Sequence, residues 1–384
     1  MPRLSFLSLF LNNLASEFPS FIFDCPNLTY LDLAQNMLTG YLPESLVTNL
    51  GKLEYLNLTS NSFNGSLPSS LSKVSNLRHL RIGNNLFSDH IPSDIGSISN
   101  LELIEMYNNS FEGSIPSSIG QLSMLQTLDL HLNGLNSTIP MELGLCTNLT
   151  FLSLAENNLS GPLPLSLTNW NKISQLGLSE NSLSGTIPSD FGKNSPNLSI
   201  VGFANNSFTG ELPPGLCSGF ALQVLTVNGN NFTGSVPDCL KNCTGLVRVR
   251  LDRNQFNGNM SEAFEVHPDL LFVSLSRNQF IGKISPQWGE CEKLTNLQMD
   301  GLTPCSTSYG SKKSTNIDMK VVIAIVVPVV VIVVVTIALS CTSLNPESRP
   351  TMRSVAQELS ARTHAYLSEP FGSITISKLS GYQK

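Results

Sequence analysis

Hydrophobic residues recur along this chain in a unit that repeats every 24 or 25 residues. Each unit opens with Leu or Ile, places apolar residues three and five positions later, and places an asparagine eight positions after the opening. Because apolar and polar residues alternate after each opening, the pattern predicts a short strand with one face turned inward. The repeated asparagines form a ladder that consists of Asn12, Asn36, Asn61, Asn85, Asn109, Asn133, Asn157, Asn181, Asn206, Asn230, Asn254 and Asn278.

The second half of each unit reads Leu/Phe-x-Gly-x-Ile-Pro, as at residues 111–116 and 183–188. Gly permits tight backbone geometry and Pro fixes φ, so we expect a turn followed by extended or loosely helical chain on the convex side. The ladder amides are expected to bond backbone groups of the adjoining turn that no regular sheet pairs. Period and motif predict an α/β-type leucine-rich-repeat solenoid, a horseshoe or superhelix of short parallel strands, over residues 1–301 with about twelve full repeats and one partial repeat.

Composition limits the class of partner. Charged residues make up 13% of the chain, its net charge is −6 and its pI is near 5.4. These values exclude nucleic acid as the main partner, because they provide no general attraction to phosphate. Twelve strand steps of about 4.8 Å give a surface roughly 60 Å long, which suits a protein or extended peptide. No Cys-x-x-Cys or clustered His and Cys spacing indicates a metal site, and no cofactor is expected.

Glycosylation acceptors of the form Asn-x-Ser/Thr are frequent in the repeats, and none of them is a ladder asparagine. Their number favours a secreted ectodomain. The acceptors are Asn27, Asn57, Asn64, Asn108, Asn136, Asn148, Asn158, Asn197, Asn205, Asn231, Asn242 and Asn259.

Cysteines occupy two kinds of position. One slot, three residues before a repeat opening, holds Cys25, Cys146, Cys243 and Cys291 and is expected to take a small buried residue. Cys217, Cys239 and Cys243 fall on adjacent repeats, whose spacing matches the usual disulfide Cα separation of about 4.4–6.8 Å. A bridge from Cys217 to either Cys239 or Cys243 is therefore predicted.

Residues 321–339 form a run of nineteen residues without a charge. As a helix this run would be about 28 Å long, enough to cross a bilayer. It predicts one transmembrane helix, preceded by a juxtamembrane linker at 302–320 and followed by a short helical tail at 340–384. Basic residues flank the run on both sides and favour neither orientation, and no signal peptide is evident.

The Gly-x-Ile-Pro consensus, the apolar run and the tail CTSLNPESRPTM at residues 341–352 together resemble plant leucine-rich-repeat receptor-like kinases. Residues 247–264 and 271–301 look most similar to the male-discoverer-interacting receptor-like kinase group. The resemblance covers nearly the whole chain. It implies a single-pass protein of the plasma membrane whose solenoid lies outside the cell and binds a peptide or a co-receptor ectodomain, with a cytoplasmic serine/threonine kinase.

The motifs of that kinase are missing from this sequence. Phosphoryl transfer needs a Gly-rich loop, a strand lysine, a catalytic-loop Asp and a metal-binding Asp-Phe-Gly. No two glycines are spaced as Gly-x-Gly, and Asp190-Phe191-Gly192 occupies the repeat slot that holds Asp94-Ile95-Gly96 elsewhere. We therefore expect no enzymatic activity on this chain, and we interpret residues 340–384 as a remnant of the kinase C-terminal end.

Strand residues that lie two, four, six and seven positions after an opening are expected to face the concave side. A cluster of guanidinium groups suited to binding a carboxylate bidentately comprises Arg248, Arg250, Arg253 and Arg277. The Arg-x-Arg pair resembles the carboxylate-binding pair of some peptide-sensing receptors of this class. A second, mixed patch suited to peptide contact comprises His79, Arg81, Glu105, Tyr107, Asp129 and His131. The alternative for both sets is a solvated strand face.

Three functions fit these features. The leading hypothesis is a membrane-anchored receptor-like protein that binds a peptide or a partner ectodomain and is kinase-deficient as written. The first alternative is an incomplete gene model of an active receptor-like serine/threonine kinase with ATP-dependent signalling. The second is a soluble leucine-rich-repeat inhibitor or scaffold, against which the apolar run at 321–339 argues.

Overall fold

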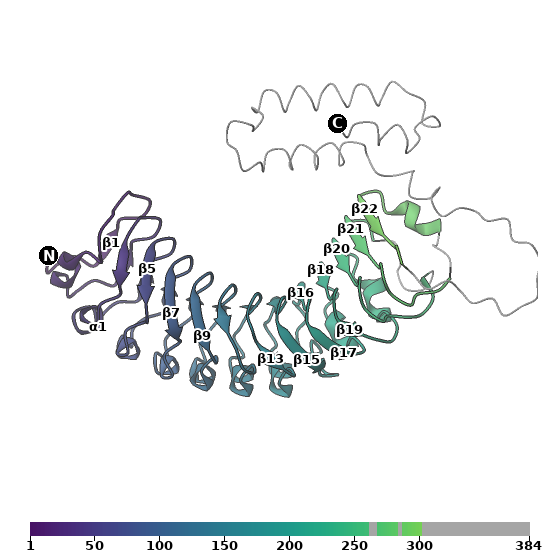
Figure 1. The fold of residues 1–384 in the computed structure, drawn as a ribbon, viewed down its shortest axis with the longest axis horizontal. Helices are drawn as coiled ribbons and strands as arrows, with labels where there is room; N and C mark the ends of the chain where they lie inside the picture. The colour runs from purple at the N-terminus through teal and green to yellow at the C-terminus, as the bar shows by residue number, and fades with distance from the viewer. Residues whose placement is uncertain (261–266, 283–285, 302–384) are drawn as a thin grey trace, which may run out of the picture. The chain divides into compact units, whose positions relative to one another are not determined.

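The computed structural model describes residues 1–260, 267–282 and 286–301, which form a stack of similar repeats (Figure 1). Each repeat adds one short strand to a 13-stranded parallel sheet, so the predicted solenoid of short parallel strands is confirmed. In Figure 1 these strands line the inner side of the stack and the short helical turns line its outer side. The strands, in sheet order, are β1 (Phe6–Ser8), β2 (Tyr30–Asp32), β4 (Tyr55–Asn57), β6 (His79–Arg81), β8 (Leu103–Glu105), β10 (Thr127–Asp129), β12 (Phe151–Ser153), β14 (Gln175–Gly177), β16 (Ile200–Gly202), β18 (Val224–Thr226), β20 (Arg248–Arg250), β21 (Phe272–Ser274) and β22 (Asn296–Gln298).

The predicted segments at 302–320, 321–339 and 340–384 lie outside the described residues. Among the helices that the structure does describe, none has the length and apolar character needed to cross a membrane.

Equivalent residues of successive repeats stand beside one another in the main sheet. Leu80 of β6 pairs with Ile104 of β8, and Ile104 pairs with Leu128 of β10. All three side chains are buried, while the residues on either side of each face the opposite way. Because the side-chain period of a strand is two, this register keeps one apolar row inside and two rows outside along the whole stack.

The second half of most repeats contains a further short strand, which the sequence pattern did not reveal. These strands build a five-stranded and a four-stranded parallel sheet beside the main one. Buried phenylalanines stack behind them, with ring centroids of Phe63, Phe87 and Phe111 spaced 6.2 Å apart. The strands are β3 (Thr39–Tyr41), β5 (Ser62–Gly65), β7 (Leu86–His90), β9 (Ser110–Gly113), β11 (Gly134–Leu135), β13 (Ser160–Gly161), β15 (Ser182–Thr186), β17 (Ser207–Gly210) and β19 (Asn231–Phe232).

The convex side is formed by short helical turns, as expected for the loosely helical half of each repeat. They begin soon after the Pro of the repeat consensus, because Pro presets φ for a helical first turn. The turns are η1 (Ser20–Asp24), α1 (Ser45–Asn49), η2 (Leu71–Lys73), η3 (Ile95–Ser97), η4 (Ser117–Gln121), η5 (Met141–Leu145), η6 (Leu165–Asn169), η7 (Pro214–Cys217), η8 (Asp238–Asn242) and η9 (Pro286–Glu290).

The ladder asparagines join neighbouring repeats through their amides, as predicted. Asn85 donates from Nδ2 to the carbonyl oxygens of Ile82 and Gly83, at 3.1 and 3.2 Å, and to that of Leu58 in the preceding repeat at 3.0 Å. Its Oδ1 accepts the backbone N–H of Phe63 at 3.1 Å. The amide of Asn85 therefore joins backbone groups of its own turn to backbone groups of the preceding repeat.

The residue before each ladder asparagine, three residues beyond the end of its strand, has a left-handed conformation. The φ angles of the non-glycine residues at this position lie between 51° and 58°, and glycine occupies it at Gly229 and, in the partial repeat, at Gly301, which precedes Leu302. Such values are uncommon outside glycine and asparagine, yet Arg253 and Arg277 adopt them at φ 56°. The conformation places these side chains on the rim of the concave side.

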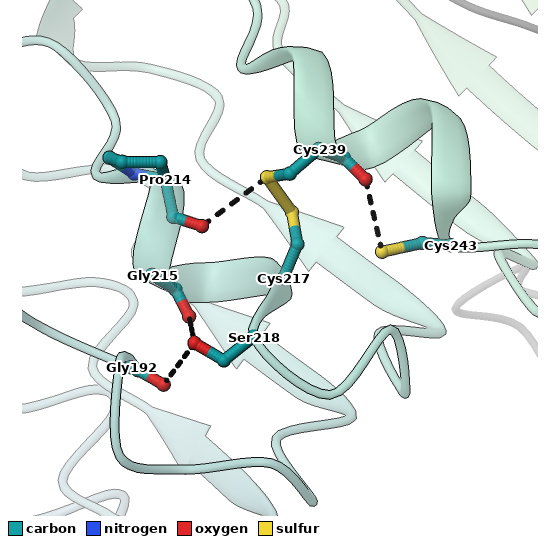
Figure 2. Close-up of a disulfide and its surroundings, with 7 residues drawn as sticks. All are labelled: Gly192, Pro214, Gly215, Cys217, Ser218, Cys239 and Cys243. Atoms are coloured by element: carbon teal, nitrogen blue, oxygen red, sulfur yellow. Dashed lines mark hydrogen bonds between the residues drawn. A yellow bond between two sulfur atoms is a disulfide. The ribbon is translucent and has the colours of Figure 1, made fainter.

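One predicted disulfide is present, between Cys217 at the end of η7 and Cys239 in η8 (Figure 2). The two Cα atoms lie 5.7 Å apart, and the bridge links turns of adjacent repeats. Cys243, the other partner considered for Cys217, is buried and unbridged, with its thiol 3.8 Å from the carbonyl oxygen of Cys239. It shares the predicted buried slot with Cys25, Cys146 and Cys291, all of which are buried.

Candidate ligand-binding face

The main sheet presents two rows of strand side chains, and the two following positions of each repeat extend this surface to its rim. The side chains that lie two, four, six and seven positions after each repeat opening form a surface that we call the concave face. The register places Arg81 of β6 beside Glu105 of β8, and Glu105 beside Asp129 of β10. The same row continues through small residues to Arg250 of β20.

The Arg-x-Arg pair lies on β20, and both side chains have partners. The guanidinium of Arg248 stands 4.4 Å from the ring centroid of Phe272 on β21. Arg250 donates from Nε and Nη2 to the two carboxylate oxygens of Asp252, both at 3.2 Å. Asp252 is only 5% exposed, and its two contacts hold the guanidinium of Arg250 in a fixed plane. Asp252 was not predicted as a site residue, although it follows Arg250 by two on the same face.

Arg253 and Arg277 stand on the rim, one repeat apart, and both are exposed. The structure therefore places Arg248 and Arg250 on β20 and Arg253 and Arg277 on the rim of the same repeat and of the next one. Beyond them, the Ser276 hydroxyl donates to Asp300 at 2.5 Å. This hydrogen bond, with a smaller contribution from the charge of Arg277, lowers the pKa of the Asp300 carboxyl.

The mixed patch predicted on β6, β8 and β10 is assembled through direct contacts. Arg81 Nη1 lies 2.8 Å from Glu105 Oε2, and His131 Nδ1 lies 2.6 Å from Asp129 Oδ1. The rings of Tyr107 and His131 stack with centroids 5.0 Å apart and an interplanar angle of 3°. The patch thus combines two partly buried carboxylates with a flat aromatic wall.

Burial shifts the ionisation of this patch. It raises the pKa of Glu105, where the nearby charge of Arg81 opposes the shift and that of Asp129 adds to it. It also raises the pKa of Tyr107, with further contributions from the two carboxylates. The patch contains two carboxylates and one guanidinium, so Arg81 balances only one of the two acids when both are ionised.

His79, assigned to the same patch, also takes part in a column of aromatic side chains. Its ring meets that of Tyr55 edge-on at 5.6 Å, and the stack continues to Tyr30 and Phe6 with centroid separations of 4.2 Å. His79 Nε2 also lies 3.7 Å from Glu102, yet burial dominates and lowers the pKa of the imidazole. This column was missed, although its members share the position two residues after the opening of successive repeats, the first residue of each strand.

Between the mixed patch and β20, the positions two, four and six after each opening form the floor of the concave face and carry no charged residue. The repeats opened by Leu198 and Leu222 carry no charged residue at any of the four concave positions. Gly177 of β14 pairs with Gly202 of β16, so backbone forms the surface at these points. In the next repeat Asn228 is 5% exposed, and its Oδ1 is buried without a hydrogen-bond partner among the described residues.

A shallow hollow of about 490 Å³ adjoins this floor on the rim. It is lined by Asn133, Glu156, Asn157, Asn158 and Glu180. Glu180 accepts a hydrogen bond from Asn205. The hollow adds two further carboxylates to the side of the concave face that already carries Glu105.

The glycosylation acceptors and the ladder asparagines differ in accessibility. Nine acceptors are exposed and three, Asn57, Asn148 and Asn259, are partly buried. The ladder asparagines are buried or partly buried, apart from Asn12 in the first repeat. The sequence distinction between the two sets thus corresponds to a structural one.

The Asp-Phe-Gly triplet contributes to the repeat stack. Phe191 is 1% exposed in the core, and Asp190 lies 3.5 Å from Lys193. Across residues 1–260, 267–282 and 286–301, no group of three or more His, Cys, Asp or Glu side chains is placed to hold a metal ion.

The parallel strands, the ladder and the convex turns define the class of fold as a leucine-rich-repeat solenoid. A leucine-rich-repeat family model matches residues 2–63, and a second such model matches 76–98, 100–122, 148–170, 172–194 and 221–243. A search of curated protein sequences found no match.

Solved structures similar to this chain include plant receptor ectodomains. One is the ectodomain of the membrane receptor kinase GASSHO1/SCHENGEN3 from Arabidopsis thaliana in complex with CASPARIAN STRIP INTEGRITY FACTOR 2. It is 32% identical with a TM-score of 0.71, over 77% of this chain and 39% of that one. The plant peptide hormone receptor RGFR1, in complex with RGF2, is 28% identical with a TM-score of 0.59, over 78% and 60%.

The Arabidopsis receptor kinase HAESA, in complex with the peptide hormone IDA and the co-receptor SERK1, is also similar. It is 30% identical with a TM-score of 0.53, over 78% of this chain and 63% of that one. This chain thus spans between 39% and 63% of the length of these three structures. It folds as a leucine-rich-repeat solenoid that resembles plant receptor ectodomains.

Proposed function

We propose that this protein is a receptor-like ectodomain that binds a peptide, or an extended segment of a partner ectodomain, along its concave face. The observation that carries the proposal is the arrangement on β20, where Asp252 orients the guanidinium of Arg250 beside Arg248. The similar receptor structures contain peptide ligands, in keeping with such a surface. The uncharged floor beside β20 offers room for an extended main chain.

Arg248 and Arg250 are the groups that we propose bind a ligand carboxylate. Arg250 keeps Nη1 free of its pair with Asp252, and Arg248 is held over Phe272 by cation–π contact. Two guanidinium groups fixed on one strand need little further ordering when a ligand binds, which favours affinity. Because Asp252 offsets one positive charge, recognition depends on geometry as well as on net charge.

The test compares the full-length chain with the variant Arg248→Ala/Arg250→Ala. The probe is a pool of random twelve-residue synthetic peptides with free C-terminal carboxylates, measured beside the same pool in amidated form. Loss of charged hydrogen bonds of about 1.5–3 kcal/mol predicts roughly 10- to 100-fold weaker binding of the free-carboxylate pool. The control is Arg78→Ala, which removes an exposed arginine paired with Glu102 outside the concave face.

Equal binding of the two pools would show that no carboxylate is recognised. Absence of binding by either pool to the unmodified chain would contradict the ligand-binding function itself.

We further propose that residues 321–339 anchor the protein in the plasma membrane with the solenoid outside, and that the exposed acceptor asparagines are glycosylated. The uncharged run of that segment supports the anchor, and extraction of the protein by alkaline carbonate would contradict it. We also propose that this polypeptide transfers no phosphate, because its sequence lacks a Gly-x-Gly pair. Incorporation of labelled phosphate by the purified chain, abolished by an ATP-competitive inhibitor, would refute that part.

A further inference from the structure

Charge on the concave face is divided into two halves. The acidic half, over the repeats from β2 to β14, carries the carboxylates of Asp32, Glu105, Asp129, Glu156 and Glu180 and the single cation Arg81, a net charge of 1 − 5 = −4. The basic half carries four arginines, and Asp252 and Asp300 are its acids, a net charge of 4 − 2 = +2. The two uncharged repeats opened by Leu198 and Leu222 lie between the halves. Such a surface favours a ligand whose own charges are separated along its length.

The strongest cation position in the acidic half is over β8 and β10. Glu105 and Asp129 are adjacent in the register and partly buried, so they are screened less than the exposed rim acids Glu156 and Glu180. Arg81 pairs with Glu105 only, and the partner of Asp129 is an imidazole. The stacked rings beside them provide a face for a guanidinium or ammonium group.

The distance between the two charged positions sets the length of the ligand. Five strand steps separate β10 from β20, and six separate β8 from β20. At about 4.8 Å per step these are roughly 24 and 29 Å. An extended chain advances about 3.3 Å per residue, so about seven to nine residues cover the span.

An independent feature marks the path between them. Asn228 stands at a concave position in the repeat next to β20, and its Oδ1 is a buried acceptor that lacks a partner among the described residues. Buried polar atoms are nearly always hydrogen-bonded, so this acceptor fits a main-chain N–H of a bound segment. Gly177 and Gly202 on the same path allow a main chain to lie close to the sheet.

We infer that the ligand is an extended segment with a basic side chain about seven to nine residues before a C-terminal carboxylate. The basic group lies over Glu105 and Asp129, the carboxylate lies at Arg248 and Arg250, and the intervening main chain passes Asn228. This inference rests on the proposed function and adds the polarity, charge spacing and length of the ligand.

A series of peptides that differ only in the position of one arginine tests the predicted spacing between the basic side chain and the C-terminal carboxylate, with the full-length chain as the binding partner. Synthetic peptides of fifteen residues, built from Ser and Gly with a free C-terminal carboxylate, carry one arginine placed between three and thirteen residues before the end. We expect affinity to peak when the arginine is seven to nine residues from the carboxylate, at least tenfold above the peptide with a separation of three. Affinity that is independent of the arginine position would overturn the inference.

Variants then assign the cation position. Glu105→Gln/Asp129→Asn should abolish the peak while retaining the preference for a free carboxylate over an amide. The matched control is Asp32→Asn, because Asp32 occupies the same repeat position, is equally buried at 8%, and accepts the N–H of Ala34 as Asp129 accepts that of His131. A peak that survives the double variant, or is lost equally in the control, would overturn the assignment.

Different experimental outcomes would contradict the proposed function and the inferred charge spacing of the ligand. If the peptides bind through Arg248 and Arg250 with no arginine preference, the ligand-binding function stands and the charge spacing is wrong. If neither this series nor the random pool binds the unmodified chain, the proposed function is wrong.

Discussion

Asn157→Leu tests how the repeats are held together, because leucine keeps the branched shape of asparagine and removes its polar groups. Asn157 Oδ1 accepts the N–H of Leu135 at 3.0 Å, and its Nδ2 donates to the carbonyl oxygens of Leu130, Leu154 and Ala155 at 3.0, 3.2 and 3.1 Å. Asn157 is 8% exposed, so water does not replace these bonds freely. The substitution should therefore destabilise the stack at this repeat.

The size of the effect follows from which groups lose every partner. Each of the three carbonyl oxygens keeps another donor, from a neighbouring ladder asparagine or from the backbone of Leu132. The N–H of Leu135 loses its acceptor. One orphaned buried donor costs about 1–3 kcal/mol and three lost neutral bonds about 0.5–1.5 kcal/mol each, so we expect a total of about 2.5–7.5 kcal/mol.

Native-state hydrogen exchange is the suitable assay, because repeat stacks open locally and a single unfolding free energy is poorly defined for them. The amide of Leu135 should exchange faster by the factor that corresponds to this loss. The matched control is Asn158→Leu, the same change at an exposed neighbour, expected to lie within about 0.5 kcal/mol of the unmodified protein. A difference between the two variants below about 1 kcal/mol would refute the role assigned to the ladder.

Two further predictions concern the disulfide and the mixed patch. Replacing both Cys217 and Cys239 with serine should destabilise the protein by about 3 kcal/mol, because the bridge closes a loop of 22 residues, and this loss should lower the melting temperature. The control is Cys243→Ala, which keeps the bridge. A reductant should lower the melting temperature of this control but not that of the double serine variant. The pKa of Glu105, measured by carbon-13 NMR, should lie above its usual 4.5, rise further in Arg81→Ala and fall in Asp129→Asn. Because the pKa of Glu105 is raised in the folded protein, protonation of this side chain stabilises the fold: the contribution is complete below pH 4.5 and is lost as the pH rises through the pKa of the folded protein. A measured pKa of Glu105 below 4.5 would contradict the argument.

The arrangement of the main sheet was predictable because every repeat shares one register. Once the openings are aligned, Arg81, Glu105 and Asp129 must fall on one row, and the structure pairs them in that order. The buried cysteine slot and the bridge from Cys217 to a neighbouring repeat follow from the same alignment. Periodicity therefore predicts which residues share a row, a face or a slot.

Features that depend on side-chain direction or on very short strands were not predictable. Cys239 and Cys243 lie four residues apart at one helical turn, and only the direction of each side chain decides which one reaches Cys217. Asp252 binds Arg250 through a choice of rotamer that spacing does not encode. The second-half strands have two to five residues, too few for alternation to distinguish them from turns.

Stability and recognition depend on different residues in this solenoid. The ladder amides bridge backbone groups at every repeat, whereas the concave ion pairs are partly exposed, and such pairs contribute little to folding. Burial even raises the pKa of Glu105, so ionising this side chain works against the fold. In a chain with only 13% charged residues, a charge kept at that cost on the concave face is better explained by a ligand than by stability. Combining Asn157→Leu with Glu105→Gln should then give additive effects on stability, while only the second substitution changes the preference for a basic ligand residue.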